Sequence, residues 1–248
     1  MANTSETGHA KNAAKFDELT SFATGYGRHY NPSKASIQLS ALQTLSTNAK
    51  NVVSAVSIAE PTYKNAVAAR ETAFAPLSKL ITRVMNALKA TDTTEAVDNS
   101  AKTLVRKIQG ARATPKKTEE EKKALADEGK EVVEISASQM SYDSRLDNFD
   151  KLIKLLISIT LYAPNEADLK VVALTTLCDD LKAKNSAVVN AATILSNARI
   201  ARNEILYKPE TGLVDTALAV KTYIKSLYGA TSPQYKQVSK LEFRAVKV

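Results

Sequence analysis

The sequence contains no tryptophan and few residues that break helices or bind metals. Its 248 residues include seven glycines, seven prolines, two histidines and one cysteine. Glycine and proline are the residues least compatible with a helix interior, and the 44% apolar fraction is that of an ordinary globular chain. We therefore predict an all-α fold: an elongated bundle of two duplicated helical-hairpin units with long antiparallel helices, related by a pseudo-twofold axis.

The scarcity of cysteine and histidine argues against several kinds of active site. A single cysteine, Cys178, cannot form an internal disulfide, and its neighbours Asp179 and Asp180 disfavour a reactive thiolate. Neither of the two histidines, His9 and His29, has a second metal ligand three or four residues further along the chain. The sequence also has no glycine-rich phosphate-binding motif. We therefore expect no metal, no cofactor and no enzymatic activity, with Cys178 buried and His29 packed at a corner.

No apolar run is long enough to span a bilayer. The most apolar stretch, Leu152–Ala163, is short and is interrupted by Lys154. The first fourteen residues are polar and have no apolar signal core. Together with the lone cysteine, these features predict a cytoplasmic protein without a transmembrane segment.

The strongest pattern is an internal repeat. When the sequence is shifted by 132 positions, Tyr30–Arg70 aligns with Tyr162–Arg202 without a gap, and sixteen of the 41 aligned positions are identical. Self-similarity of this length indicates duplication of a helical unit.

Each repeat begins at a Tyr-x-Pro corner. A helix over 13–29 precedes Tyr30, and a helix over 142–161 precedes Tyr162. Proline disfavours helix at the residue before it, so both helices should end there. Ser33 and Asn165 are suitable N-caps for the helices that follow. We expect the two tyrosines to pack in the corners and to tie their hydroxyls to the backbone.

The helices after the corners are long. In the second copy, an apolar stripe runs without a helix breaker from Glu166 to about Tyr207. In the first copy, the corresponding helix is expected over 34–90, with Pro61 causing a kink rather than an end. Gly110 and Gly229 should end the last helices of the two copies.

These patterns divide the chain into five segments. They are a flexible N-terminal arm (1–12), helical repeat unit 1 (13–113), a charged helical linker (114–141) with a Thr118–Glu121 capping box, helical repeat unit 2 (142–231), and a basic extended C-terminal tail (232–248).

The tail is the candidate interaction segment. The net charge of the chain is +8, and residues 221–248 hold six cations against one acid, a local charge of +5. Apolar and charged residues alternate over 240–245, which predicts a strand. The residues proposed to contact a partner are Tyr235, Lys236, Lys240, Leu241, Phe243 and Arg244.

Among the polar residues kept between the copies, four are singled out as candidate contacts between the repeats: Asn65, Arg70, Asn197 and Arg202. Either they line a polar groove, or they form a buried hydrogen-bonded network between the repeats, which we favour.

The leading functional hypothesis is a non-enzymatic structural or protein-interaction protein. Its partner would be another protein, first of all a second copy, contacted by strand addition through the tail. One alternative is binding of nucleic acid or another anionic surface by the basic tail. A second alternative is a membrane-acting, pore-forming protein that inserts Leu152–Ala163.

Overall fold

The computed structural model describes residues 6–111 and 140–244, together with Thr118, Glu120, Lys123, Ala124 and Asp127. These residues form helices and connecting turns with no strand, which confirms the all-α prediction. The predicted linker over 114–141, with its capping box, and the last four residues of the tail lie largely outside the described residues.

The chain forms two compact units that differ from the predicted segments. Unit 1 comprises residues 1–64 and 190–248, and unit 2 comprises residues 65–189. The unit boundaries fall inside α2 (Leu39–Phe74) and α7 (Val171–Tyr207), so each long helix contributes to both units. Each compact unit therefore contains parts of both sequence repeats. A helix of this length exceeds what one small core can cover, so its two ends pack in different cores.

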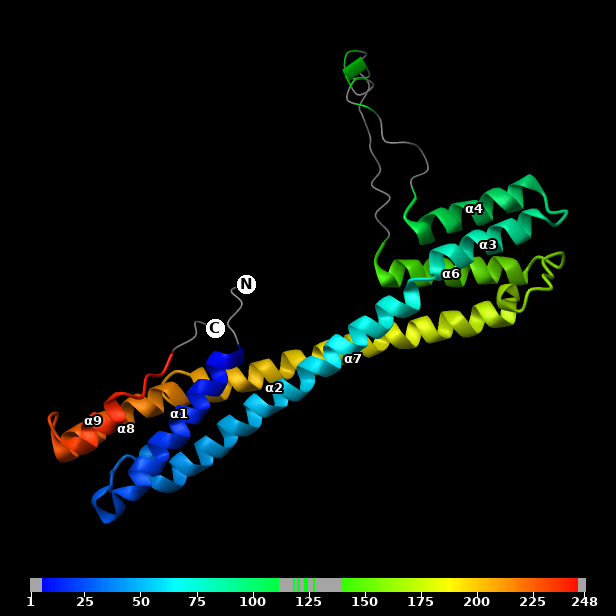
Figure 1. Ribbon diagram of the computed structural model, residues 1–248. Helices are drawn as coiled ribbons and strands as arrows, with labels where there is room; N and C mark the ends of the chain where they lie inside the picture. The colour runs from blue at the N-terminus through cyan, green and yellow to red at the C-terminus, as the bar shows by residue number, and fades with distance from the viewer. Residues whose placement is uncertain are drawn as a thin grey trace. The chain divides into compact units, whose positions relative to one another are not determined.

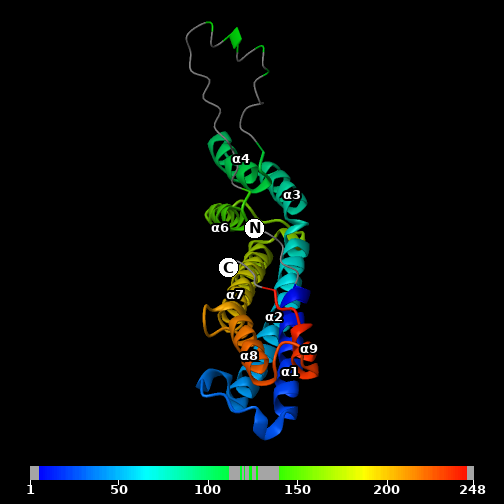
Figure 2. The ribbon, with the colours of Figure 1, turned by 90° about the vertical axis from the view of Figure 1, so that its left-hand side faces the viewer.

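Unit 1 is built around α1 (Glu6–Gly25), the first part of α2, the last part of α7, α8 (Leu213–Tyr228) and α9 (Pro233–Ser239). Helix α8 packs against both α1 and α9 (Figures 1 and 2). The fully buried side chains of this core include Phe16, Leu19, Leu42, Leu213 and Ile224.

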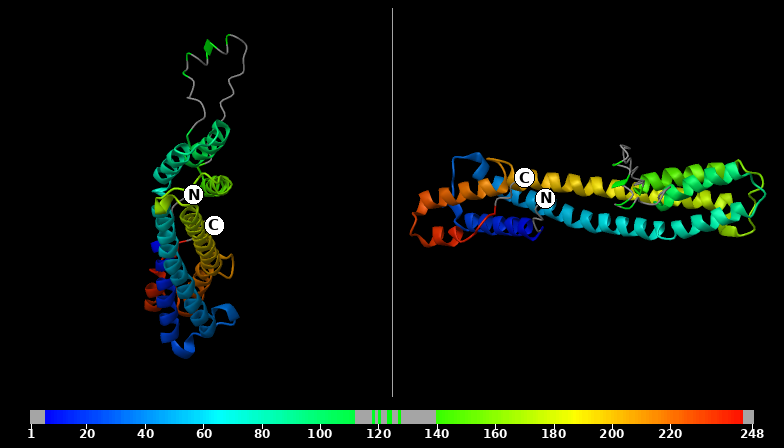
Figure 3. Two further views of the ribbon diagram at one scale, coloured as in Figure 1. Left: turned by 90° about the vertical axis from the view of Figure 1, so that its right-hand side faces the viewer. Right: turned by 90° about the horizontal axis from the view of Figure 1, so that it is seen from above.

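Unit 2 is built around the end of α2, α3 (Leu77–Lys89), α4 (Glu95–Gln109), α6 (Tyr142–Ile157) and the first part of α7. Helix α4 packs against both α3 and α6 (Figures 1 and 3). The fully buried side chains of this core include Ile81, Leu88, Ile108, Phe149, Leu152 and Leu174.

Each Tyr-x-Pro corner contains a short 3₁₀ turn before its long helix begins. The turns are η2 (Ala35–Ile37) and η3 (Ala167–Leu169), and the helices begin at Leu39 and Val171. The predicted N-caps Ser33 and Asn165 are therefore wrong: both are exposed and precede the turn. In each corner the tyrosine hydroxyl bonds to the carbonyl of the last residue of the 3₁₀ turn, and the next residue, Gln38 or Lys170, is extended, so the long helix begins only after it.

The tyrosine hydroxyls make these bonds. Tyr30 donates to the carbonyl of Ile37 over 2.7 Å, and Tyr162 donates to the carbonyl of Leu169 over 2.9 Å. Both tyrosines are buried, which confirms the predicted packing and the predicted bond to the backbone. His29, expected to pack in the first corner, is exposed; it ends η1 (Gly27–His29), the turn between α1 and the corner.

Proline decides where the first long helix ends. Helix α2 passes through Pro61, as predicted, but it stops at Phe74, and α3 starts after Pro76. The single helix predicted over 34–90 is therefore two helices, because Pro76 supplies no N–H and disfavours helix at Ala75. The predicted ends at Gly110 and Gly229 are confirmed, and both glycines have positive φ (69° and 88°).

Candidate functional site

The N-terminal arm and the tail are more structured than predicted. Helix α1 starts at Glu6 rather than at residue 13. In the tail, residues 233–239 form α9, and Leu241–Arg244 have no regular secondary structure, so the predicted strand is wrong. The sequence did carry the signal for α9: Ser232 caps the helix by accepting the N–H of Tyr235 (3.1 Å), and proline occupies the first helical position.

The predicted tail residues divide by face. Tyr235, Leu241 and Phe243 pack against the core of unit 1, whereas Lys236, Lys240 and Arg244 are exposed. Side chains that face the core and exposed side chains therefore do alternate over 241–244, but the segment that carries them is folded back on its own unit and is not a strand.

Side chains of unit 1 bind the backbone of this segment. The Asn12 amide donates to the carbonyl of Arg244 (2.9 Å) and accepts from the N–H of Arg244 (3.1 Å), as a neighbouring strand would. The Lys15 ammonium donates to the carbonyl of Glu242 (2.8 Å), and Lys221 donates to the carbonyl of Leu241. Since these backbone groups are already bonded, the segment is poorly suited to strand addition.

Of the four polar residues singled out in the repeats, Asn65 and Arg70 belong to unit 2, and Asn197 and Arg202 belong to unit 1, so a network between the repeats stays a prediction. Arg70 donates to Asn185 (2.9 Å) and stacks on the ring of Tyr142 (3.9 Å) in unit 2. Arg202 is buried in unit 1 and donates to Asn203. Asn65 and Asn197 are exposed. The shared sequence pattern gave no means of separating the partly buried Arg70 and the buried Arg202 from the two exposed asparagines.

Cysteine and histidine are the side chains of this chain best suited to nucleophilic or metal chemistry. Cys178 is buried, as expected, and burial raises the pKa of its thiol. His9 is buried, with Nδ1 2.6 Å from the Tyr207 hydroxyl. Among the described residues, no group of three histidine, cysteine or carboxylate side chains is placed to hold a metal ion. Within the same residues, no helix is long and apolar enough to cross a membrane.

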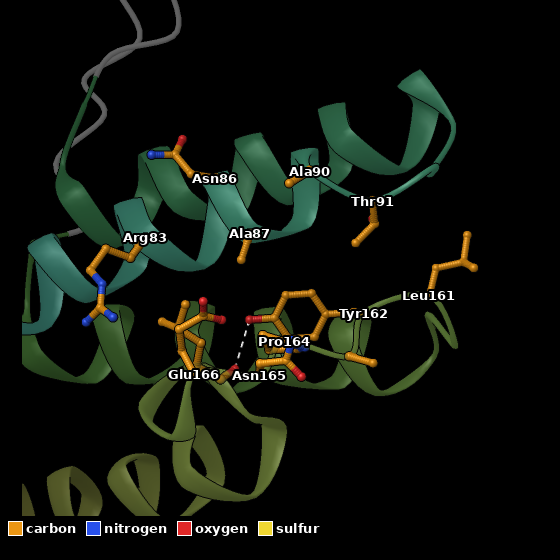
Figure 4. A pocket seen from close by; sticks show the side chains of 12 residues that line it. Arg83, Asn86, Ala87, Ala90, Thr91, Leu161, Tyr162, Pro164, Asn165 and Glu166 are labelled. Carbon is orange, nitrogen blue, oxygen red and sulfur yellow. Dashed lines mark hydrogen bonds between the residues drawn. The ribbon is translucent and has the colours of Figure 1, made fainter.

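A pocket lies at the Tyr162 corner of unit 2. It has a volume of about 460 Å³ and is open to solvent (Figure 4). Helix α3 contributes one wall and the corner the other. The lining residues are Arg83, Asn86, Ala87, Ala90, Thr91, Leu161, Tyr162, Ala163, Pro164, Asn165, Glu166 and Leu169.

The pocket combines an apolar floor with a charged rim. Tyr162 and Leu169 are buried beneath it, and burial, with a smaller effect of the Glu166 and Asp168 carboxylates, raises the pKa of Tyr162 to about 12. Arg83 on α3 pairs with Asp168 on η3, and the second of its two contacts joins Nη2 to Oδ1 over 3.2 Å. Because the phenol stays neutral and bonded to the Leu169 carbonyl, the floor is fixed, and the exposed rim groups are those available to a ligand.

The corresponding corner of unit 1 is closed. There, α8 faces the corner and inserts Tyr223, whose ring meets the Tyr30 ring edge-on (5.3 Å between centroids, 89° between planes). The Tyr223 hydroxyl also accepts the N–H of Asn31 (3.2 Å). In unit 2, α3 faces the corner and presents Ala87 and Ala90 instead.

Sequence reasoning missed this pocket. The alanines and Tyr223 are visible in the sequence, but only the packing of α3 and α8 shows that they face equivalent corners. No protein-family model, no curated protein and no solved structure matches the chain, so the candidate site is defined by its geometry alone.

Proposed function

We propose that this chain is a non-enzymatic protein-interaction protein, and that the pocket at the Tyr162 corner receives a side chain of a partner protein. One observation carries the proposal: the same corner is built twice, and only one copy is filled by the chain itself. At the Tyr30 corner, the side chain of Tyr223 packs against the corner tyrosine. At the Tyr162 corner, the corresponding position is an open pocket.

Several further contacts support the equivalence of the two corners. The ion pair between Asp17 and Lys50 (2.7 Å) has its counterpart between Asp150 and Lys182 (3.0 Å). The two 3₁₀ turns and the starts of α2 and α7 are also separated by 132 positions, the shift that aligns the repeats. We interpret these matches as an internal duplication in which one copy kept a place for a partner; the pseudo-twofold relation stays a prediction.

The test is selection of binding peptides with and without the pocket. A random peptide library is selected on the full chain, and each binder is measured on Ala90→Trp, which places an indole in the pocket. Ala183→Trp on α7 is the matched control, because Ala183 is also exposed in unit 2 and does not line the pocket. We expect binders to lose at least about tenfold in affinity on Ala90→Trp and to keep their affinity on Ala183→Trp.

Circular dichroism checks that both tryptophan variants keep the helical fold. Peptides that bind Ala90→Trp as tightly as the unchanged chain would overturn the proposal, as would a selection that yields no binder.

Self-assembly is part of the same hypothesis, and truncation of the tail is not a clean test of it. A chain ending at Thr231 would lose Val238 and Leu241, which are buried in the core of unit 1. Any loss of oligomers in that truncation would therefore report unfolding as well as a missing arm. Light scattering across protein concentration should instead compare the full chain with Lys236→Glu/Lys240→Glu, which changes only exposed side chains.

A second candidate function, binding of an anionic surface, is favoured by the exposed cations of the same region. Lys225, Lys236, Lys240 and Arg244 are exposed in unit 1, and no salt bridge is found for them among the described residues. Binding to nucleic acid or anionic vesicles should weaken steeply with salt and fall in Lys236→Glu/Lys240→Glu. Binding that ignores salt would exclude this candidate. The membrane-insertion alternative finds no support, since Leu152, Ile153 and Leu156 are buried in unit 2.

A further inference from the structure

We propose that the pocket at the Tyr162 corner binds a phenol group, supplied by a tyrosine side chain of a partner protein, in the manner in which the Tyr30 corner holds Tyr223. This inference rests on the proposed function and adds the chemistry of the ligand. It uses the closed corner of the chain as the template for the open one.

The template has two components. The first is ring packing, since Tyr223 and Tyr30 meet at 89° with their centroids 5.3 Å apart, an arrangement that aromatic pairs prefer. The second is polar, since the Tyr223 hydroxyl accepts the Asn31 N–H at 3.2 Å. A phenylalanine could supply only the first component.

The open corner retains both partners of the template. Tyr162 aligns with Tyr30 and is held in the same way, by its bond to the carbonyl seven residues further on. Ala163 aligns with Asn31 and lines the pocket. Within the part of the chain that the structure describes, no hydrogen bond from the Ala163 N–H is found, so this donor is available to a ligand hydroxyl.

The rim suits a neutral phenol rather than a phosphorylated one. Asn165 and Glu166 lie on the rim beside Tyr162 (Figure 4) and can accept the O–H of a bound phenol. The Glu166 and Asp168 carboxylates are close enough to contribute to the raised pKa of Tyr162. A phosphate dianion at this place would meet the Glu166 carboxylate, while Arg83 is already paired with Asp168.

The phenol must come from another protein rather than from a second folded copy. The chain has nine tyrosines, and all of them belong to the described residues. Each is buried or partly buried in its own unit, so no copy offers a fully exposed tyrosine. The volume of about 460 Å³ exceeds that of one ring and leaves room for the residues beside the tyrosine.

The experiment is an NMR titration of the full chain, followed at the backbone amides. The probes are N-acetyl-tyrosinamide, N-acetyl-phenylalaninamide, N-acetyl-phosphotyrosinamide and p-cresol. We expect N-acetyl-tyrosinamide to shift the Ala163 amide and to bind about fivefold more tightly than the phenylalanine probe, the effect of one added hydrogen bond. The phosphorylated probe should bind more weakly than either.

Two variants locate the binding. Ala90→Trp should abolish the Ala163 shift, and Ala183→Trp should preserve it. Tyr223→Ala removes the side chain that covers the Tyr30 corner. In this variant, p-cresol should shift the Asn31 amide and raise the thermal midpoint of unfolding, because a ligand that fills a cavity stabilises the folded state. This second site tests the template without depending on the folding of Ala90→Trp.

Each outcome bears on the inference. Equal affinity for the tyrosine and phenylalanine probes, or no shift at Ala163, would overturn it. Affinity for p-cresol equal to that for N-acetyl-tyrosinamide would assign the site to a free phenol and overturn the protein source. Library peptides that lack tyrosine but are blocked by Ala90→Trp would overturn the phenol inference and leave the proposed function standing. Absence of any blocked peptide would overturn both.

Discussion

Replacement of Asn12 by alanine tests how the two ends of the chain are held in unit 1. Asn12 is 2% exposed and belongs to α1, far in sequence from its partners. Its amide makes two hydrogen bonds to the backbone of Arg244, of 2.9 Å and 3.1 Å, and a longer one of 3.3 Å to the Tyr207 hydroxyl. Alanine removes all three and leaves the Arg244 N–H and C=O without a protein partner.

The expected loss follows from these bonds. Each intramolecular hydrogen bond contributes about 1 kcal/mol net, and partly buried groups left unpaired add to the cost. We expect Asn12→Ala to lower the free energy of unfolding by about 2–3 kcal/mol. For a chain of this size, such a loss corresponds to a fall of about 5–10 °C in the thermal midpoint.

The assay is urea unfolding followed by far-ultraviolet circular dichroism, together with hydrogen exchange at the Arg244 amide. Lys15→Ala is the matched control, because its hydrogen bond to the Glu242 carbonyl is exposed and should be worth no more than about 0.5 kcal/mol. We expect exchange at Arg244 to accelerate strongly in Asn12→Ala and little in Lys15→Ala. If Asn12→Ala were as stable as the control and Arg244 stayed protected, the inference that Asn12 holds the tail would be refuted.

Three further predictions concern unit 2. Tyr162→Phe leaves the buried Leu169 carbonyl unpaired and should lower the free energy of unfolding by about 1–2 kcal/mol, measured by urea unfolding. An unchanged urea midpoint would mean that this hydrogen bond does not stabilise the fold. Cys178 should react with a thiol reagent at least about tenfold more slowly in the folded chain than in urea, since its thiol is buried and its pKa is raised; equal rates would contradict the described burial. Hydrogen bonds from Lys154 and Lys182 lower the pKa of Asp150 below its usual 3.8, so this carboxylate stabilises the fold above that pH, and its contribution is lost as the pH falls through the lowered value. Asp150→Asn should therefore lower the free energy of unfolding by less than about 1 kcal/mol at neutral pH, and stability should then fall less steeply as the pH is lowered. An unchanged loss of stability at acid pH would count against the ion pairs of Asp150 with Lys154 and Lys182.

Local patterns predicted the helical elements well because their causes are local. The Tyr-x-Pro corners, the passage of α2 through Pro61 and the ends at Gly110 and Gly229 all follow from backbone rules that act over a few residues. The repeat located both corners, since aligned tyrosines and apolar positions need no knowledge of distant partners.

The same local rules failed where a distant side chain supplied the bond. Leu241–Arg244 alternate as a strand would, but Asn12 and Lys15 on α1 satisfy their backbone groups, so no neighbouring strand is required. The early start of α1 has the same cause, because the polar residues His9 and Asn12 are buried only where Tyr207 and Arg244 meet them.

The sequence by itself therefore determined the helical class, the two tyrosine corners and the expectation that Cys178 is buried, since each depends on residue type and short-range spacing. The tertiary structure alone decided which residues face a corner. Tyr223 lies in α8, and Ala90 directly follows α3. Neither sequence shows what its helix packs against; only the packing places Tyr223 against Tyr30 and Ala90 in the pocket beside Tyr162. The candidate site arises from that difference. Long-range packing brings the lining residues together at the Tyr162 corner and places no counterpart of Tyr223 among them.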